Sequence, residues 1–295
     1  QLASKPFNYE VRVTLADYQS TIDKYNNPEK KLGDDYYYEG MKVGEIWGYE
    51  TEGFFTSQAD IDSHAKQPYF YAGATAGQWL PGDIKFKDLN GDGVIDYGNN
   101  TVDNPGDQKI IGNSEPRFIY GINLSGDWNN FFVSAFFQGV GKQDWWPGSE
   151  ASYFWGMYNR PYNDMPKSHL GNIWTEENPN TYFPRLRGYS SEEPYAELNL
   201  KQTRYLQNIA YIRMKNIQLG YTLPKSFISK LRMQNAKVYV SGENLWSWSP
   251  FYKYSKDLDV EAVRGSDRDL TEGTSGNGYS YPILKSVSFG LSVTF

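Results

Sequence analysis

Six stretches of the chain alternate between apolar and polar residues with a period of two. This period predicts half-buried β-strands, because successive side chains of a strand point to opposite faces. The predicted strands cover residues 7–18, 117–128, 130–140, 208–223, 236–249 and 286–295. The last one ends on an aromatic residue, Phe295. The pattern therefore predicts an all-β, antiparallel architecture.

The strand predicted at 208–223 carries charges in its middle. Simple alternation places Arg213 and Lys215 on one face together with apolar residues, namely Ile209, Tyr211, Ile217, Leu219 and Tyr221. We expect this face to be mixed in polarity.

The connections between the predicted strands alternate in length. Residues 126–130 form a tight link and 224–235 a compact one, whereas 19–115, 141–206 and 250–280 are long. In an antiparallel ribbon this order gathers all the long loops at one end. Outer-membrane barrels have such an asymmetry, with short periplasmic turns and long extracellular loops. A soluble sandwich need not sort its loops in this way.

Composition supports the β reading and narrows the function. The chain is 39% hydrophobic but 17% aromatic, which is typical of strands rather than helices. A net charge of −6 without a run of Lys or Arg argues against nucleic-acid binding. The absence of cysteine excludes disulfides and a cysteine nucleophile. No apolar run is long enough for a transmembrane helix. Because the chain starts at Gln1, without Met or signal peptide, we expect a mature or truncated product.

Six segments, in this order, resemble the C-terminal part of SusC/RagA-type TonB-dependent outer-membrane transporters. They are GDIKFKDLNGDGVID, IIGNSEPRFIYGINL, FFVSAFFQGVGKQ, YIRMKNIQLGYTLP, VYVSGENLW and YPILKSVSFGLSVTF. Each segment is modest alone, but the ordered set is specific, and it runs from about residue 44 to 295. One departure is YSKDLDVEAV, which only approximates the usual Asp-Pro-Glu after the GENL strand.

The resemblance implies a transmembrane barrel of about 22 strands around an N-terminal plug. It also implies a TonB box, a SusD-like surface lipoprotein that closes over the mouth, and energy from TonB acting on the plug. The chain would supply the last strands, in contact with outer-membrane lipid, and the rest of the transporter would supply the plug and other strands. The terminal strand matches the family's barrel-assembly signal, carried here by Phe289, Leu291, Val293 and Phe295.

On this interpretation the chain divides into five parts. Residues 1–18 form a barrel strand and 116–141 a barrel hairpin, while 207–295 hold the C-terminal barrel strands. Residues 19–115 form a long extracellular region with an Asp/Gly-rich loop, and 142–206 an aromatic-rich extracellular loop.

The Asp/Gly-rich loop DLNGDGVID follows the register of an EF-hand calcium loop. Its predicted calcium ligands are Asp88, Asn90, Asp92, Val94 through its carbonyl, and Asp96. Position 12, normally a bidentate Glu, is Asn99, for which Asp103 or Asp107 could substitute. The alternative is a glycine-rich turn held by Asx hydrogen bonds. In either case we expect a structural brace, with calcium as the only ion to consider and no cofactor required.

The aromatic-rich loop predicts contact with substrate or with a partner protein, since Trp, Tyr and Arg dominate binding hot spots. The candidate residues are Trp145, Trp146, Tyr153, Trp155, Tyr158 and Arg160. The alternative is that these rings pack the loop's own core, and packing or partner contact is favoured over direct substrate contact.

Catalysis is not expected. The two histidines, His64 and His169, lack a second ligand at metal spacing, and no GxSxG, HExxH or P-loop motif is present. The leading hypothesis is thus the C-terminal barrel portion of an importer of glycans or oligopeptides, the quoted segments being common to both. The alternative hypothesis is a secreted, calcium-braced β-sandwich that binds glycans.

Overall fold

A computed structural model describes residues 7–33, 36–67, 79–149, 151–160, 162–192, 196–263 and 281–295. Parts of the predicted long connections, such as 264–280, lie outside these ranges. The main element is a six-stranded antiparallel sheet with the order β1-β6-β7-β10-β11-β12. Its strands are β1 (Phe7–Ala16), β6 (Arg117–Trp128), β7 (Phe131–Lys142), β10 (Tyr211–Thr222), β11 (Asn235–Trp248) and β12 (Ser286–Thr294). All six coincide with predicted strands to within a few residues.

Three two-stranded sheets and most of the small helices lie in the long connections. These sheets pair β2 (Glu45–Tyr49) with β5 (Gln108–Asn113), β3 (Thr51–Phe54) with β4 (Ile84–Phe86), and β8 (Asp144–Trp145) with β9 (Gln207–Asn208). The α-helices are α1 (Gln58–Ser63), α2 (Ser152–Trp155) and α3 (Lys225–Ile228). The 3-10 turns are Gly156–Tyr158, Lys167–His169, Gly188–Ser191, Ser229–Leu231 and Pro250–Lys253. None of the helices in the described ranges has the length and apolar character that crossing a membrane requires.

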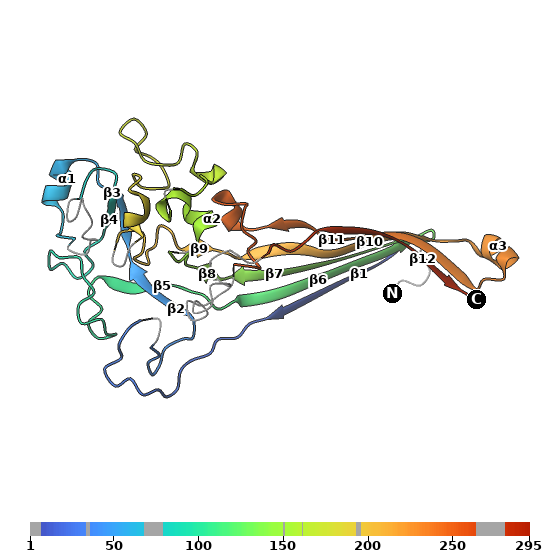
Figure 1. The fold of residues 1–295 in the computed structure, drawn as a ribbon. Coiled ribbons are helices and arrows are strands. Elements are labelled where there is room, and N and C mark those ends of the chain that lie inside the picture. The colour runs from blue at the N-terminus through green and yellow to red at the C-terminus, as the bar shows by residue number, and fades with distance from the viewer. Residues whose placement is uncertain are drawn as a thin grey trace.

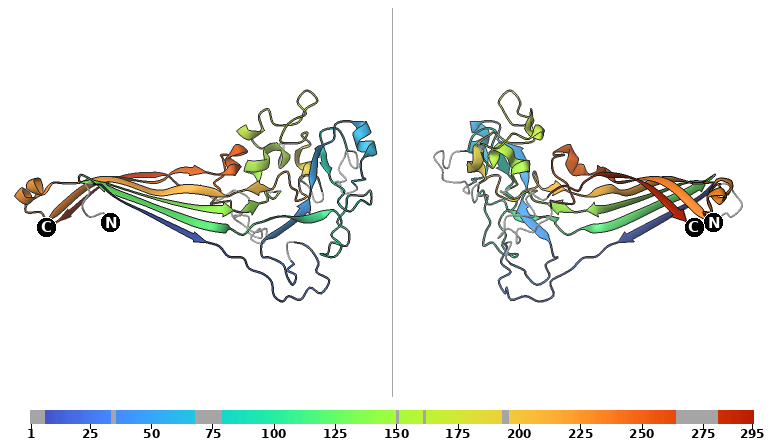
Figure 2. Two further views of the ribbon diagram at one scale, coloured as in Figure 1. Left: turned by 180° about the vertical axis from the view of Figure 1, so that it is seen from behind. Right: turned by 45° about the vertical axis from the view of Figure 1, so that its right-hand side comes forward.

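All long connections leave from one end of the sheet, and the short ones from the other (Figure 1). We call the described parts of residues 17–116, 143–210 and 249–285 the loop domain. At the opposite end, Asn129 and Asn130 join β6 to β7 with φ values of 47° and 70°. Two left-handed residues in a two-residue loop match the right-handed twist of the flanking strands. The second short connection holds α3, which lies far from the loop domain in every view (Figure 2).

A β-bulge in β10 corrects one prediction. Met214 pairs with Phe137 and Asn216 with Phe136, so Lys215 is an extra residue. Because a bulge shifts the side-chain alternation by one, Arg213 shares its face with Asn216 and Gln218 instead of Ile217. The prediction that Ile217, Leu219 and Tyr221 share the face of Arg213 is therefore wrong. Period-two counting cannot detect an inserted residue.

The buried core lies mainly in the loop domain and reaches the adjoining ends of β7 and β10 at Val140 and Tyr211. One cluster gathers mostly aromatic residues of the long connections, among them Trp155, Tyr158, Phe183 and Tyr205, none with more than 1% exposure. A smaller cluster of buried residues consists of Leu32, Tyr38 and Met41. In the described residues, no second sheet packs on the six-stranded one. The sandwich alternative therefore lacks its defining feature.

Candidate functional site

The two faces of the sheet differ sharply in polarity. Pairing registers place one continuous apolar set on the same face of all six strands. Its members are Phe7, Tyr9, Val11, Val13 and Leu15 on β1; Ile122, Leu124 and Trp128 on β6; Phe131, Val133, Ala135 and Phe137 on β7; Ile212, Met214, Ile217, Leu219 and Tyr221 on β10; Val238, Val240, Trp246 and Trp248 on β11; and Val287, Phe289, Leu291 and Val293 on β12. Many of these side chains are more than one-third exposed, up to 87% for Phe289.

The opposite face is polar. It carries Glu10, Arg12, Asn123, Ser125, Ser134, Gln138, Asn216, Gln218, Ser241 and Ser288. This face also carries the rings of Phe132 and Tyr239, which lie against glycines of neighbouring strands. A Cβ on Gly290 would meet the Tyr239 ring, and one on Gly220 would meet the Phe132 ring. The sheet therefore has one exposed apolar face and one polar face. A sheet buried in a protein core does not show this pattern.

Aromatic residues mark both ends of the apolar face. At the short-turn end, pairing sets Phe7 beside Trp128, Trp128 beside Phe131, and Phe131 beside Tyr221. The rings of Phe131 and Tyr221 lie 4.7 Å apart. At the loop-domain end, Trp246 and Trp248 are about half exposed. Tyr and Trp concentrate where apolar and aqueous surroundings meet.

Four of the six predicted contact residues lie inside the loop domain. Trp145 and Trp146 are 5% and 8% exposed, and Trp155 and Tyr158 are fully buried. The Trp155 indole donates to the carbonyls of Pro147 and Gly148, and the Tyr158 hydroxyl to that of Pro184. These residues pack the loop's own core, which was the alternative explanation.

The other two predicted contact residues reach the surface. Tyr153 is 54% exposed on α2, and Arg160 is half-buried, with one guanidinium nitrogen donating to the Asn159 carbonyl. Binding of substrate or partner by these two stays a prediction, and they are the members of the set that a partner could touch.

The Asp/Gly-rich loop is closed by backbone amides donating to carboxylates. Asp88 accepts from the amides of Gly91 and Gly93 at 2.6 and 2.9 Å, which lowers its pKa. Asp92 and Asp96 each accept from the amide two residues ahead. These are the Asx hydrogen bonds of the alternative prediction, a glycine-rich turn.

Asp107 holds this loop to the rest of the domain. Its buried carboxylate accepts hydrogen bonds from the amides of Leu89 and Asp96 at 2.7 and 2.8 Å. The backbone amide of Asn99, at position 12, donates to the Asn104 carbonyl at 3.1 Å. Among the described residues, no group of three His, Asp or Glu side chains is arranged to hold a metal ion. Calcium binding by Asp88, Asn90, Asp92, Val94 and Asp96 stays a prediction.

A buried charged cluster joins distant parts of the loop domain. Asp83, fully buried, accepts from the Nε atoms of Arg185 and Arg187 at 2.6 and 2.8 Å. Glu197, also fully buried, accepts from the Ile84 amide at 2.8 Å. Burial, reinforced by the nearby Asp83 carboxylate, raises the pKa of Glu197 to about 8. The partners lie about a hundred residues apart, so no local sequence signal pointed to them.

A second ionic cluster ties the loop domain to the sheet. Arg213 on β10 donates to Asp259 at 2.6 Å, and Lys215 at the bulge to Glu261 at 2.5 Å. Asp259 also accepts from the Ile283 amide at 3.1 Å, next to β12. The residues after the GENL strand thus fold back onto the polar face of β10. The charges that looked misplaced in mid-strand anchor this loop.

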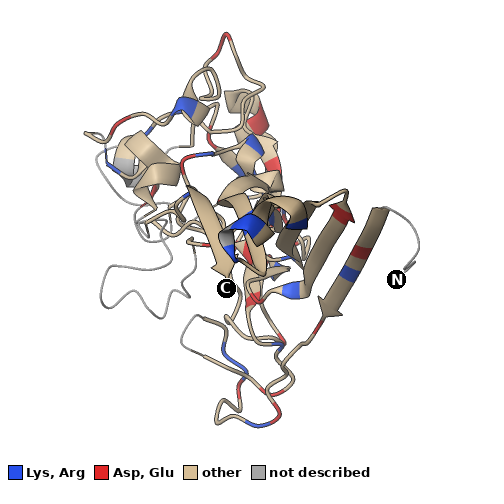
Figure 3. Cartoon of the chain, turned by 90° about the vertical axis from the view of Figure 1, so that its right-hand side faces the viewer, with Lys and Arg blue, Asp and Glu red and all other residues tan. Residues whose placement is uncertain are grey.

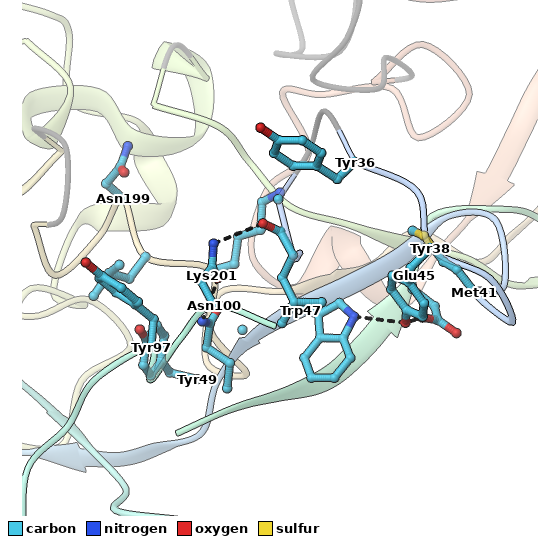
Figure 4. A pocket seen from close by; sticks show the side chains of 15 residues that line it. Tyr36, Tyr38, Met41, Glu45, Trp47, Tyr49, Tyr97, Asn100, Asn199 and Lys201 are labelled. Carbon is cyan, nitrogen blue, oxygen red and sulfur yellow. Dashed lines mark hydrogen bonds between the residues drawn. The ribbon is translucent and has the colours of Figure 1, made fainter. Parts of the chain in front are cut away.

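A cavity of about 380 Å³ lies between the 32–49 segment and residues 97–108 and 199–201. Its walls include five aromatic rings and a few polar side chains (Figure 4): Tyr36, Tyr38, Trp47, Tyr49, Tyr97, Glu45, Asn100, Gln108, Asn199 and Lys201. The Tyr38 hydroxyl donates to Glu45, and its pKa is raised to about 12 by burial and by that carboxylate. The size and the mixed lining suit part of a small organic ligand.

The predicted assembly-signal residues lie on and beyond β12. Phe289, Leu291 and Val293 belong to the apolar face, and Phe295 follows the last strand with 78% exposure. Together with β1, β12 forms an edge of the open sheet.

Comparison with known sequences gives consistent relatives. No protein-family model matches the chain. The TonB-dependent receptors P3 and P26 of Formosa agariphila are each 29% identical to it, over 259 and 264 residues. Both alignments cover 87% of this chain, which spans only 22% and 23% of those two receptors.

Comparison with solved structures gives the same fold. The RagAB peptide importer in its closed-closed state matches 99% of this chain with a TM-score of 0.63 and 18% identity, over 28% of the matched chain. A second RagAB peptide transporter structure matches with a TM-score of 0.62 and 19% identity, over 27% of that chain. The resemblance predicted from sequence is thereby confirmed: the chain is similar in sequence to a segment of TonB-dependent receptors and in fold to the RagAB peptide importer.

Proposed function

We propose that this chain is one side of the barrel wall of an outer-membrane nutrient importer. The carrying observation is the continuous, exposed apolar face shared by all six strands, opposite a polar face. Exposing so large an apolar surface to water is unfavourable in free energy, whereas contact with lipid is favourable. Strands of 9 to 14 residues are long enough to cross a bilayer when tilted. The polar face would line the interior, around the plug.

The remaining strands of a closed barrel of about 22 would continue from the edges β1 and β12. An open sheet edge in hydrocarbon leaves amides and carbonyls unpaired, so closure by further strands is a physical requirement of this proposal. TonB would act through the plug. The segment itself would perform no catalysis.

The loop domain would face the cell exterior and meet a SusD-like lipoprotein. In support, the loop domain gathers all the long connections at one end, and the RagAB peptide importer shares the fold. Tyr153 is the proposed contact at this surface. Changing Tyr153, which is 54% exposed, to Ala should weaken co-purification with the lipoprotein, whereas changing Tyr25, which is 43% exposed in another loop, to Ala should not. Equal co-purification of both variants would count against this contact.

The cavity beside Trp47 supports contact with cargo on its way into the barrel. Tyr36 is 46% exposed and lines this cavity, so Tyr36→Ala should reduce cargo binding while leaving folding intact. The class of cargo, glycan or oligopeptide, would be read from which of the two loses affinity. A variant that binds both as well as the parent would remove the cavity from the import path.

Single cysteines test the membrane topology directly, because the chain contains no native cysteine. In intact cells a membrane-impermeant maleimide should label Tyr153→Cys in the loop domain. It should label Ser226→Cys at the other end only after the outer membrane is permeabilised. Val240→Cys on the apolar face should stay unlabelled by this reagent in both conditions, because a thiol facing hydrocarbon does not ionise to the reactive thiolate. Equal labelling of Tyr153→Cys and Ser226→Cys in intact cells would refute the proposed orientation.

A further inference from the structure

The turn between β10 and β11 concentrates positive charge. Residues 224–235 contain three cations, Lys225, Lys230 and Arg232, and no acidic residue, in a chain whose net charge is −6. All three side chains are exposed. Figure 3 looks onto this end of the molecule, where α3 lies toward the viewer. The excess of cations is local and opposite in sign to the chain as a whole.

The turn at residues 224–235 is folded and has its own buried residue and hydrogen bonds. Ile228 is 2% exposed, and the Met233 amide donates to its carbonyl at 3.1 Å. Arg232 ends the second helical turn with a left-handed φ of 57°. Phe227, one residue before the buried Ile228, points outward with 56% exposure. The fold therefore presents one aromatic ring and three cations together.

The position of the turn matches the headgroup layer of a bilayer. The aromatic row Phe7, Trp128, Phe131 and Tyr221 ends the apolar face, and Lys225 follows Tyr221 by only four residues. Four extended residues span at most about 13 Å. The headgroup region adds roughly 5 to 8 Å to each side of the hydrocarbon core. Long Lys and Arg side chains cover the remaining difference.

We infer that the α3 turn binds the phosphates of anionic phospholipids in the membrane leaflet opposite the loop domain. This rests on the proposed function, which places this end of the sheet at that leaflet. The three cations would contact headgroups, and Phe227 would rest at the interface, where aromatic rings are favoured. Charge complementarity selects anionic over zwitterionic lipid, since each cation near such a surface contributes about 1 kcal/mol, or about fivefold in affinity.

The test compares two triple variants of the complete transporter in nanodiscs. Lys225→Gln, Lys230→Gln and Arg232→Gln together neutralise the turn. Lys253→Gln, Lys256→Gln and Lys285→Gln remove three exposed lysines at the opposite end of the sheet. Bound lipid is counted by native mass spectrometry from discs that mix phosphatidylglycerol with phosphatidylethanolamine. The turn variant should lose at least about fivefold of its preference for phosphatidylglycerol, and added salt should do the same to the parent. The control should match the parent.

Three results would overturn the inference. The turn variant could retain the parent's preference, both triple variants could lose it equally, or the turn variant could lose a co-purifying protein and no lipid. Failure of the proposed function is distinguishable, since the parent itself would then be missing from the outer-membrane fraction. Phe227→Ser adds a second reading: it should reduce lipid retention without changing the preference for anionic headgroups.

Discussion

The sheet and the loop domain use the same residue types in opposite ways. Trp155 lies fully buried among rings from distant connections, while Trp248, on the apolar face of β11, is 55% exposed. The loop domain hides its apolar groups from water and is organised like a soluble protein. The sheet presents them outward and has no core of its own. The hydrophobicity of a segment alone therefore does not show whether its side chains are buried. The surroundings of each region determine whether apolar side chains point inward or outward.

Matched tryptophan substitutions should give the largest contrast between the two regions. Trp155→Ala should destabilise the loop domain by about 3 to 5 kcal/mol, because it opens a cavity in a packed core. Trp248→Ala should cost about 1 kcal/mol, since protein covers only half of its ring. Hydrogen exchange at the Phe183 amide, which donates to the Asn172 carbonyl inside the loop domain, measures the difference. Similar losses of protection would break the comparison.

A charge on each face of β10 probes the sheet alone. Leu219→Arg places a cation on the apolar face and should cost about 2 to 4 kcal/mol in a bilayer, lowering the amount of folded protein in the outer membrane. Gln218→Arg, one residue away on the polar face, should be nearly neutral. The readout is the folded fraction in purified outer membranes. If the two variants insert equally well, the apolar face does not meet lipid.

The buried carboxyl of Glu197 makes the stability of the loop domain sensitive to pH. Its pKa is raised in the folded state to about 8, so the native state binds a proton that the unfolded chain releases above about pH 4.5. Stability should therefore fall as pH rises between about 5 and 8, by at most about 1.4 kcal/mol per unit. Glu197→Gln should flatten this dependence, measured as the protease-cleavage temperature of the loop domain. An unchanged slope would assign it to another group.

The smallest expected effect concerns the Asp/Gly-rich loop. Asp88→Ala with Asp92→Ala removes Asx hydrogen bonds worth about 1 kcal/mol each and should loosen residues 88–96 without affecting barrel insertion. Calcium should slow hydrogen exchange in this loop in the parent and not in the variant. Asp23→Ala, which removes an exposed carboxylate elsewhere in the loop domain, serves as the control. Loss of insertion would show that the loop is more than a local brace.

Much of the sheet could be predicted because its signal is local. The alternation in Phe7–Ala16 is strict, and the predicted bounds of β6 match the observed Arg117–Trp128. The resemblance then supplied the architecture that six strands alone could not. The tight link predicted at 126–130 contains the observed two-residue turn, Asn129 and Asn130, whose left-handed φ values asparagine accepts readily.

The loop domain was largely beyond prediction because its contacts are long-range. Asp83 meets Arg187 across more than a hundred residues, and Trp145 packs on Phe251 from another connection. The aromatic cluster was visible in the sequence, but composition does not say whether rings face a partner or one another. Asp107 was named only as a substitute ligand, yet it organises the loop by accepting backbone amides.

The bulge at Lys215 also constrains how β10 can change over evolution. Apolar and polar residues alternate regularly on each side of the bulge, but the alternation is offset by one residue between the two halves of β10. Losing this one residue would turn every side chain of one half toward the wrong medium, with Arg213 facing hydrocarbon or Leu219 facing the interior. A point substitution elsewhere in β10 alters the contacts of one side chain. A single deletion at the bulge shifts the alternation of every side chain in half of the strand. Lineages that keep this wall should therefore tolerate replacement of Lys215 far better than its removal.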